Sequence, residues 1–202
     1  TDHDKALIGI IAGFAQSNIE TGSISIESDT DSFFAGGYGH FYLGSVNLTT
    51  TLIGGYEEHD DDRLVFDNTS GFETVSSKLD SFFLSPSLTL SAAHDLGGNI
   101  ELRPSASIIY GIAWFDGYRE TGTTATNLVV DSRAVQAITT RLQLAAAQSF
   151  GEDIEFEVLV GSTSRYTDED DIRANLSGTD FSYTPSSDDS VYGVYAGANL
   201  RV

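Results

Sequence analysis

The sequence contains no cysteine and no methionine, and only 10 of its 202 residues are lysine or arginine. Without cysteine, neither a disulfide framework nor a thiolate metal site can form. Because methionine is missing, we expect the chain to be a mature or excised piece. The formal net charge of −20 argues against nucleic acid as a partner, since binding nucleic acid requires clustered basic side chains.

Long hydrophobic runs are also missing. The longest apolar or small-residue stretch near the start, ALIGIIAGFA at residues 6–15, has ten residues. A membrane-spanning helix needs about 20. If the protein lies in a membrane, it therefore does not cross that membrane with helices.

What the sequence does contain is a long alternation with a period of two. In residues 81–115 hydrophobic side chains occupy nearly every even position, on both sides of the pair Gly97 and Gly98. This period predicts two β-strands with one apolar and one polar face. Ordinary strands have about 5–6 residues, whereas a tilted strand that crosses a bilayer has about 9–11. The apolar positions are Phe82, Leu84, Pro86, Leu88, Leu90 and Ala92, then Leu102, Pro104, Ala106, Ile108, Tyr110, Ile112 and Trp114.

The same alternation recurs along the chain and predicts eight strands in a single domain, residues 1–202. Their connections alternate between short and long, as in an antiparallel up-and-down transmembrane β-barrel with tight periplasmic turns and long outer loops. The predicted fold class is therefore all-β. The strands are expected at 7–16, 33–43, 46–56, 82–92, 101–114, 133–150, 154–165 and 191–202. The short connections are 44–45, 94–99 and 151–153, and the long ones are about 18–32, 57–78, 116–132 and 166–190.

The polar faces of these strands carry charges of both signs. At mid-depth in lipid each arginine would cost about 2–4 kcal/mol, so we expect these side chains to face the lumen. The predicted lumen-facing residues are Arg103, Arg141, Glu155, Glu157 and Arg201, and the predicted lipid-facing residues are Leu88, Leu90, Ile108, Leu144 and Val158. Tyr56 and Trp114 each close an apolar face just before an acidic segment, as expected for an aromatic girdle at the membrane interface.

No pattern indicates catalysis or a cofactor. HDDDR at 59–63 and TDEDDIR at 167–173 concentrate carboxylates but lack the spacing of a calcium-binding loop, so we expect solvated acidic loops and no specific metal site. The four histidines form no recognisable metal or catalytic motif, and His59 is expected in a loop. GGYG at 36–39 lies inside a predicted strand and lacks the lysine of a phosphate-binding loop.

From Phe33 onward the sequence resembles the autotransporter β-domain family, the translocators of type V secretion. GGYGHFYLG, the segment IELRPSASIIYGIAWFDGYRETGTTATNLVVDS and the strand RLQLAAAQSF carry this resemblance. The resemblance implies a twelve-stranded outer-membrane barrel with a helix in its pore. This chain has eight predicted strands and ends in Arg201 and Val202, not in an aromatic residue. We therefore expect it to form part of a larger barrel, with two strands missing at each end.

The predicted function is that of an outer-membrane translocator domain that anchors in the membrane and helps to export or display a passenger. The expected partners are outer-membrane lipid, a covalently linked passenger domain and the barrel-assembly machinery. One alternative is a small stand-alone outer-membrane barrel whose acidic loops bind a ligand or surface. Another is a soluble barrel with a ligand cavity.

Overall fold

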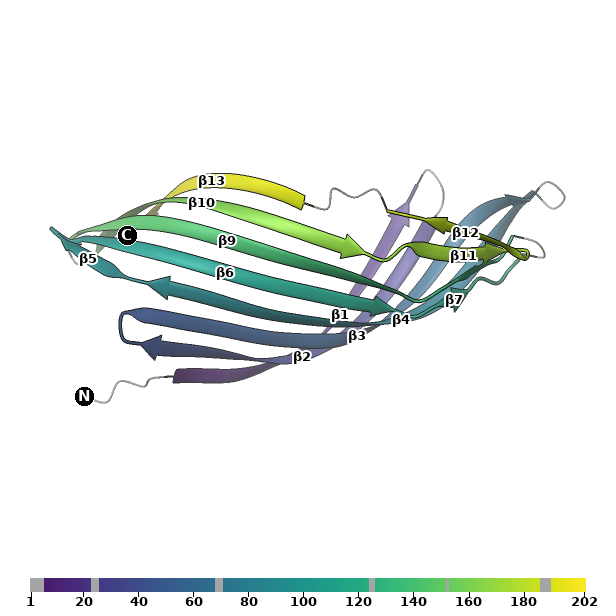
Figure 1. Cartoon of the computed structure of the whole chain (residues 1–202), viewed down its shortest axis with the longest axis horizontal. Helices are drawn as coiled ribbons and strands as arrows, with labels where there is room; N and C mark the ends of the chain where they lie inside the picture. Colours follow the sequence, from purple (N-terminus) through teal and green to yellow (C-terminus); the bar gives the residue numbers. More distant parts are fainter. Residues whose placement is uncertain (1–5, 23–25, 68–70, 124–125, 152, 186–189) are drawn as a thin grey trace.

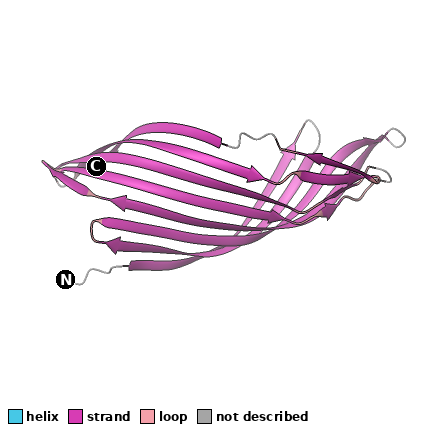
Figure 2. Cartoon of the chain, in the orientation of Figure 1, coloured by secondary structure: helices cyan, strands magenta, loops and turns pink. Residues whose placement is uncertain are grey.

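The computed structural model describes residues 6–22, 26–67, 71–123, 126–151, 153–185 and 190–202. In this part of the chain nearly all residues belong to strands (Figure 2). The described residues include no helix that could cross a membrane.

Eight long antiparallel strands form one twisted sheet, in which each strand pairs with the next long strand along the chain (Figure 1). They correspond one for one to the eight predicted strands, and the all-β prediction is confirmed. They are β1 (Ala6–Thr21), β2 (Ile26–Leu43), β3 (Val46–Asp67), β4 (Gly71–Ala92), β6 (Ile100–Phe115), β9 (Arg133–Phe150), β10 (Ile154–Glu169) and β13 (Ser190–Arg201). A short strand, β5 (His94–Gly97), also pairs with β6 and occupies most of a connection that was predicted to be a turn.

Two of the four predicted long loops are wrong, because they are mainly continuous β-hairpins. β1 and β2 remain paired up to Thr21 and Ile26, and β3 and β4 remain paired up to Asp67 and Gly71. The predicted loops 18–32 and 57–78 therefore extend the sheet as paired strands. The apolar alternation disappears there while the backbone ladder continues.

The other two predicted loops also contain strands. A second sheet has the order β12, β11, β8, β7, and its strands continue the long strands beyond short breaks. Asp116 still donates a backbone hydrogen bond to Asp80, and Ser76 and Thr121 exchange two more, so the segment after β6 stays beside β4. The four short strands are β7 (Tyr118–Arg119), β8 (Leu128–Val130), β11 (Ile172–Leu176) and β12 (Thr179–Tyr183).

At the opposite end of the sheet the connections are tight. Gly44, Gly98 and Gly151 lie at these connections with φ of 73°, 65° and 75°, in the left-handed region that favours glycine. The tight turns are staggered along the strand direction. The row of paired residues that starts at the β2–β3 turn meets β9 about six residues before the β9–β10 turn, which lies four strands away. With a rise of about 3.3 Å per residue and about 4.8 Å between strands, aligning these turns requires a strand tilt of about 45°. This tilt is typical of membrane barrels.

Glycines on the polar face allow aromatic rings to lie flat against the neighbouring strand. A Cβ atom on Gly9 would lie 2.3 Å from the ring of Tyr38, and one on Gly161 would lie 2.4 Å from the ring of Tyr195. Gly13 and Gly55 are covered in the same way by Phe34 and Phe83. These contacts replace side-chain packing on a sheet that has few buried residues.

The sheet is not closed. β1 and β13 are its two edges, and neither pairs with the other within the residues that the structure describes.

Candidate functional site on the polar face of the sheet

The strand register collects the predicted lumen-facing and lipid-facing residues on opposite faces. Directly paired residues share a face of a sheet, and the face alternates along each strand. Leu88 pairs with Ile108, and Leu144 and Val158 fall on the same face, as does Leu90. We call this the apolar face. Arg103, Arg141, Glu155, Glu157 and Arg201 all lie on the other face, which we call the polar face.

Solvent exposure follows the same alternation. Along β10, Phe156, Val158 and Val160 on the apolar face are exposed, whereas Glu155 and Glu157 on the polar face are half-buried. Polar side chains are thus more covered than apolar ones, the reverse of a soluble protein. Side chains on the polar face therefore cover one another more than side chains on the apolar face do.

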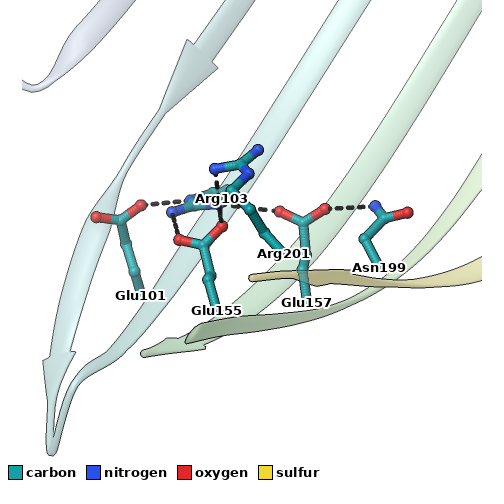
Figure 3. A network of polar contacts seen from close by, with 6 residues as sticks. All are labelled: Glu101, Arg103, Glu155, Glu157, Asn199 and Arg201. Atoms are coloured by element: carbon teal, nitrogen blue, oxygen red, sulfur yellow. Dashed lines mark hydrogen bonds and ion pairs between the residues drawn. The ribbon is translucent and has the colours of Figure 1, made fainter. Parts of the chain in front are cut away.

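Near the tight turns the polar face carries an ion-pair network (Figure 3). Arg103 on β6 donates to Glu155 at 2.8 Å and to Glu157 at 3.1 Å, both on β10, and it also donates to Glu101. Arg201 on the edge strand β13 donates to Glu155 at 3.3 Å. Asn199 donates to Glu157 at 3.0 Å. Three carboxylates and two guanidiniums therefore connect β6, β10 and β13.

Small residues on the intervening strand make this network possible. Arg103 must reach across β9, which presents Ala145 and Ala147 at this level. Both alanines are almost fully buried beneath the network, with 2% and 3% of their surface exposed. A larger side chain at either position would separate Arg103 from the glutamates on β10.

A second polar cluster lies toward the opposite end of the sheet. His59, expected in a loop, is on the polar face of β3. Its Nδ1 atom lies 3.1 Å from the Thr30 hydroxyl and its Nε2 atom 3.0 Å from the Ser81 hydroxyl. Ser81 in turn donates to Glu57 at 3.0 Å. Ser81 is fully buried, and the second nitrogen of His59 contacts a hydroxyl and not the carboxylate that orients the base of a catalytic triad.

Further along β3, Arg63 and Glu120 form a forked ion pair. Both nitrogen–oxygen distances are 2.7 Å, and the hydrogen-bonded carboxylate raises the pKa of Arg63 above its ordinary value. Glu120 retains only 4% of its side-chain exposure and also accepts the backbone N–H of Leu128 at 2.8 Å. The pair connects the β3–β4 hairpin to the β7–β8 hairpin, and no local sequence pattern indicates it.

Between the two clusters, the polar face of β3, β4 and β6 is lined mainly by small hydroxyl side chains. Thr51 and Ser87 are 2.6 Å apart across β3 and β4, and Ser107 on β6 pairs with Arg141 on β9. Such groups offer hydrogen bonds without bulk.

On the apolar face five aromatic side chains occupy consecutive paired positions on β1, β2, β3, β4 and β6. Phe14 and Phe33 have ring centroids 4.7 Å apart, and Tyr56 and Phe82 have theirs 5.0 Å apart. Trp114 pairs with Phe82 and completes the row. Beyond this row, on the same face, the residues change to Gln16, Asp31, Glu58, Asp80 and Asp116.

The acidic runs are distributed over both faces. In HDDDR, Asp60 and Asp62 lie on the apolar side of β3 and Asp61 on the polar side. TDEDDIR spans the end of β10 and the start of β11. Within the described ranges, no group of three or more histidine, aspartate or glutamate side chains is arranged to hold a metal ion.

The comparisons with known proteins agree with this architecture. The family model described as the autotransporter beta-domain matches residues 2–202. No curated protein matches the chain. The match covers all eight long strands and both polar clusters. The chain belongs to the autotransporter β-domain family, the outer-membrane translocators that export a linked passenger domain.

Proposed function

We propose that residues 1–202 form one domain that is part of the barrel wall. Its polar face lines the export lumen and its apolar face contacts lipid. The carrying observation is the register, which brings the apolar sets of all eight strands to one face and the charged side chains of the membrane-crossing segments to the other. An arginine in lipid would cost about 2–4 kcal/mol at the midplane, whereas in a water-filled lumen it stays solvated. Outer-membrane lipid is accordingly the partner of the apolar face. The barrel-assembly machinery is the partner of the chain while it folds.

The periplasmic end and the middle of the polar face have different roles in this proposal. The network around Arg103 holds β6, β10 and β13 together at the periplasmic end. The hydroxyl-lined middle gives an extended passenger chain transient hydrogen bonds without retaining it. No step requires bond making or breaking by the protein.

Single cysteines test the assignment of faces, because the chain has none of its own. Cysteines at Leu88, Ile108, Leu144 and Val158 should react with lipid-soluble thiol reagents. Cysteines at Ser87, Ser107, Arg141 and Glu157 should react with small water-soluble reagents added to intact outer membranes. Passenger display at the cell surface, scored in the same cells, identifies variants that fold. The reverse reactivity would overturn the assignment, and uniform protection of both sets would indicate a soluble two-layer core.

A further inference from the structure

Two arginines on the polar face, Arg141 and Arg165, have no partner among the residues that the structure describes. Among the described residues, Arg63, Arg103 and Arg201 on this face bind carboxylates. The Arg133 guanidinium lies over the ring of Phe115, 4.8 Å from its centroid. By contrast, the exposed side chains of Arg141 and Arg165 make no ion pair, hydrogen bond or ring contact within the described ranges.

These two arginines are neighbours in the middle of the sheet. Arg141 on β9 pairs with Thr163 and Arg165 on β10 pairs with Thr139, so the arginines are diagonal neighbours. Diagonal positions lie about 7–8 Å apart, within reach of long side chains. Two like charges at this separation repel each other. An anion placed between the two side chains would offset this repulsion and interact with both of them.

Among the described residues, no carboxylate on the polar face is close enough to pair with either arginine. Along β10 the nearest are Glu169, about 13 Å beyond Arg165, and Glu157, about 20 Å before Thr163, at about 3.3 Å per residue. The space around the pair is also open, since Arg141 faces Ser107 and Thr163 faces Gly193. In a chain with a net charge of −20, the charged side chains that the structure describes in this region are thus all positive.

We propose that Arg141 and Arg165 form a carboxylate-binding site for acidic segments of the exported polypeptide. This inference rests on the proposed function, because it requires the polar face to line the lumen. Guanidinium groups bind carboxylates through paired charge-assisted hydrogen bonds, and two of them can hold one acidic side chain between β9 and β10. The exported chain is the occupant because, in the proposed function, it is the polymer that passes this point.

The test places a single cysteine at Ser107, beside Arg141, in the protein as it is carried in the outer membrane. The rates of its modification by an anionic sulfonate and by a cationic ammonium thiosulfonate reagent are compared. Replacing both arginines (R141Q/R165Q) should lower the anionic-to-cationic rate ratio at least about tenfold, the loss expected for a charge-assisted hydrogen bond. The matched control is R119Q/R173Q, which removes two cations in the hairpin extensions and should leave the ratio unchanged.

A competition experiment identifies the occupant. A twelve-residue peptide of alternating aspartate and serine should slow modification of the cysteine at position 107, and its lysine–serine counterpart should not. In R141E/R165E this preference should reverse, which a merely structural role would not produce.

Each outcome is decisive. An unchanged rate ratio with full reactivity overturns the site but leaves the proposed function intact. A changed ratio without protection by the acidic peptide shows a site for small anions only and overturns the assignment to the exported chain. A cysteine at 107 that reacts with neither reagent contradicts the lumen assignment itself, and therefore the proposed function as well.

Discussion

Replacing Glu120 by alanine should open the β7–β8 hairpin without unfolding the barrel wall. Removing one partner of a buried ion pair costs about 3–5 kcal/mol. Arg63 keeps 33% of its side chain exposed, so water replaces part of the lost interaction. We therefore expect a loss of about 2 kcal/mol in local stability, or about a 30-fold increase in local opening. The variant also leaves the N–H of Leu128 without its acceptor.

Hydrogen exchange measures this opening directly. The amides of Ser76 and Thr121 donate to each other's carbonyl groups at 2.8 and 2.9 Å, so their exchange reports whether the hairpin stays against β4. Glu120→Gln keeps an acceptor for Leu128 and should show a smaller effect. The matched control is Asp60→Asn, which breaks the exposed pair with Lys78 and should change little. Unchanged exchange at Thr121 in Glu120→Ala would refute the idea that this ion pair holds the hairpin.

Two further predictions concern packing and orientation. Gly55→Ala should destabilise the barrel by about 1–3 kcal/mol, because its Cβ would lie 2.4 Å from the ring of Phe83 and 2.6 Å from the carbonyl oxygen of Phe33. Gly37→Ala, whose Cβ would have no neighbour closer than 3.5 Å, is the control in urea unfolding, and equal midpoints would contradict the packing argument. An epitope tag in the β11–β12 turn at 177–178 should stain intact cells, whereas one at 97–98 should stain only permeabilised cells. Staining of the second tag on intact cells would invert the topology.

The sequence predicted strands well where one face meets lipid and the other meets water. In β4 and β6 this contrast produces the period of two, from Phe82 to Trp114 on the apolar face. In β2, β3 and β4 the predicted ends coincide with Phe33, Tyr56 and Phe82 of the aromatic row, whereas the strands themselves extend to Ile26, Asp67 and Gly71. In Glu57–Arg63 both faces are charged or polar, the alternation carries no information, and a paired strand was predicted to be a loop.

Long-range contacts on the polar face could be predicted only in part. Charges of both signs on the polar faces indicated that these side chains face inward, and Arg103, Glu155, Glu157 and Arg201 do meet. The contact of Arg63 with Glu120 joins residues 57 positions apart in two different hairpins, which no periodicity encodes. His59 was predicted to lie in a loop because both faces of its strand segment are polar there, so no alternation marked the strand.

The two open edges lead to the last prediction. Among the described residues, β1 and β13 each lack a strand partner on one side, next to an apolar face that the proposed function places in lipid. Each unpaired backbone N–H or C=O group costs several kcal/mol in hydrocarbon, so both edges must pair before insertion. Closing eight strands on themselves would leave a lumen that side chains fill, yet Ser107, Thr163 and Gly193 leave open space around Arg141. We therefore expect additional strands to complete a wider, twelve-stranded wall.

Refolding into detergent tests this expectation. The 202-residue chain alone should give an aggregated or poorly cooperative product, because its edges stay open. A longer chain that supplies strands beyond β1 and β13 should give a cooperative, heat-resistant barrel. Glu120→Ala, introduced into the longer chain, controls for general instability, since it loosens one hairpin and leaves the edges paired. A monodisperse, heat-resistant barrel from the 202 residues alone would show that β1 pairs with β13, and the wider wall would then be wrong.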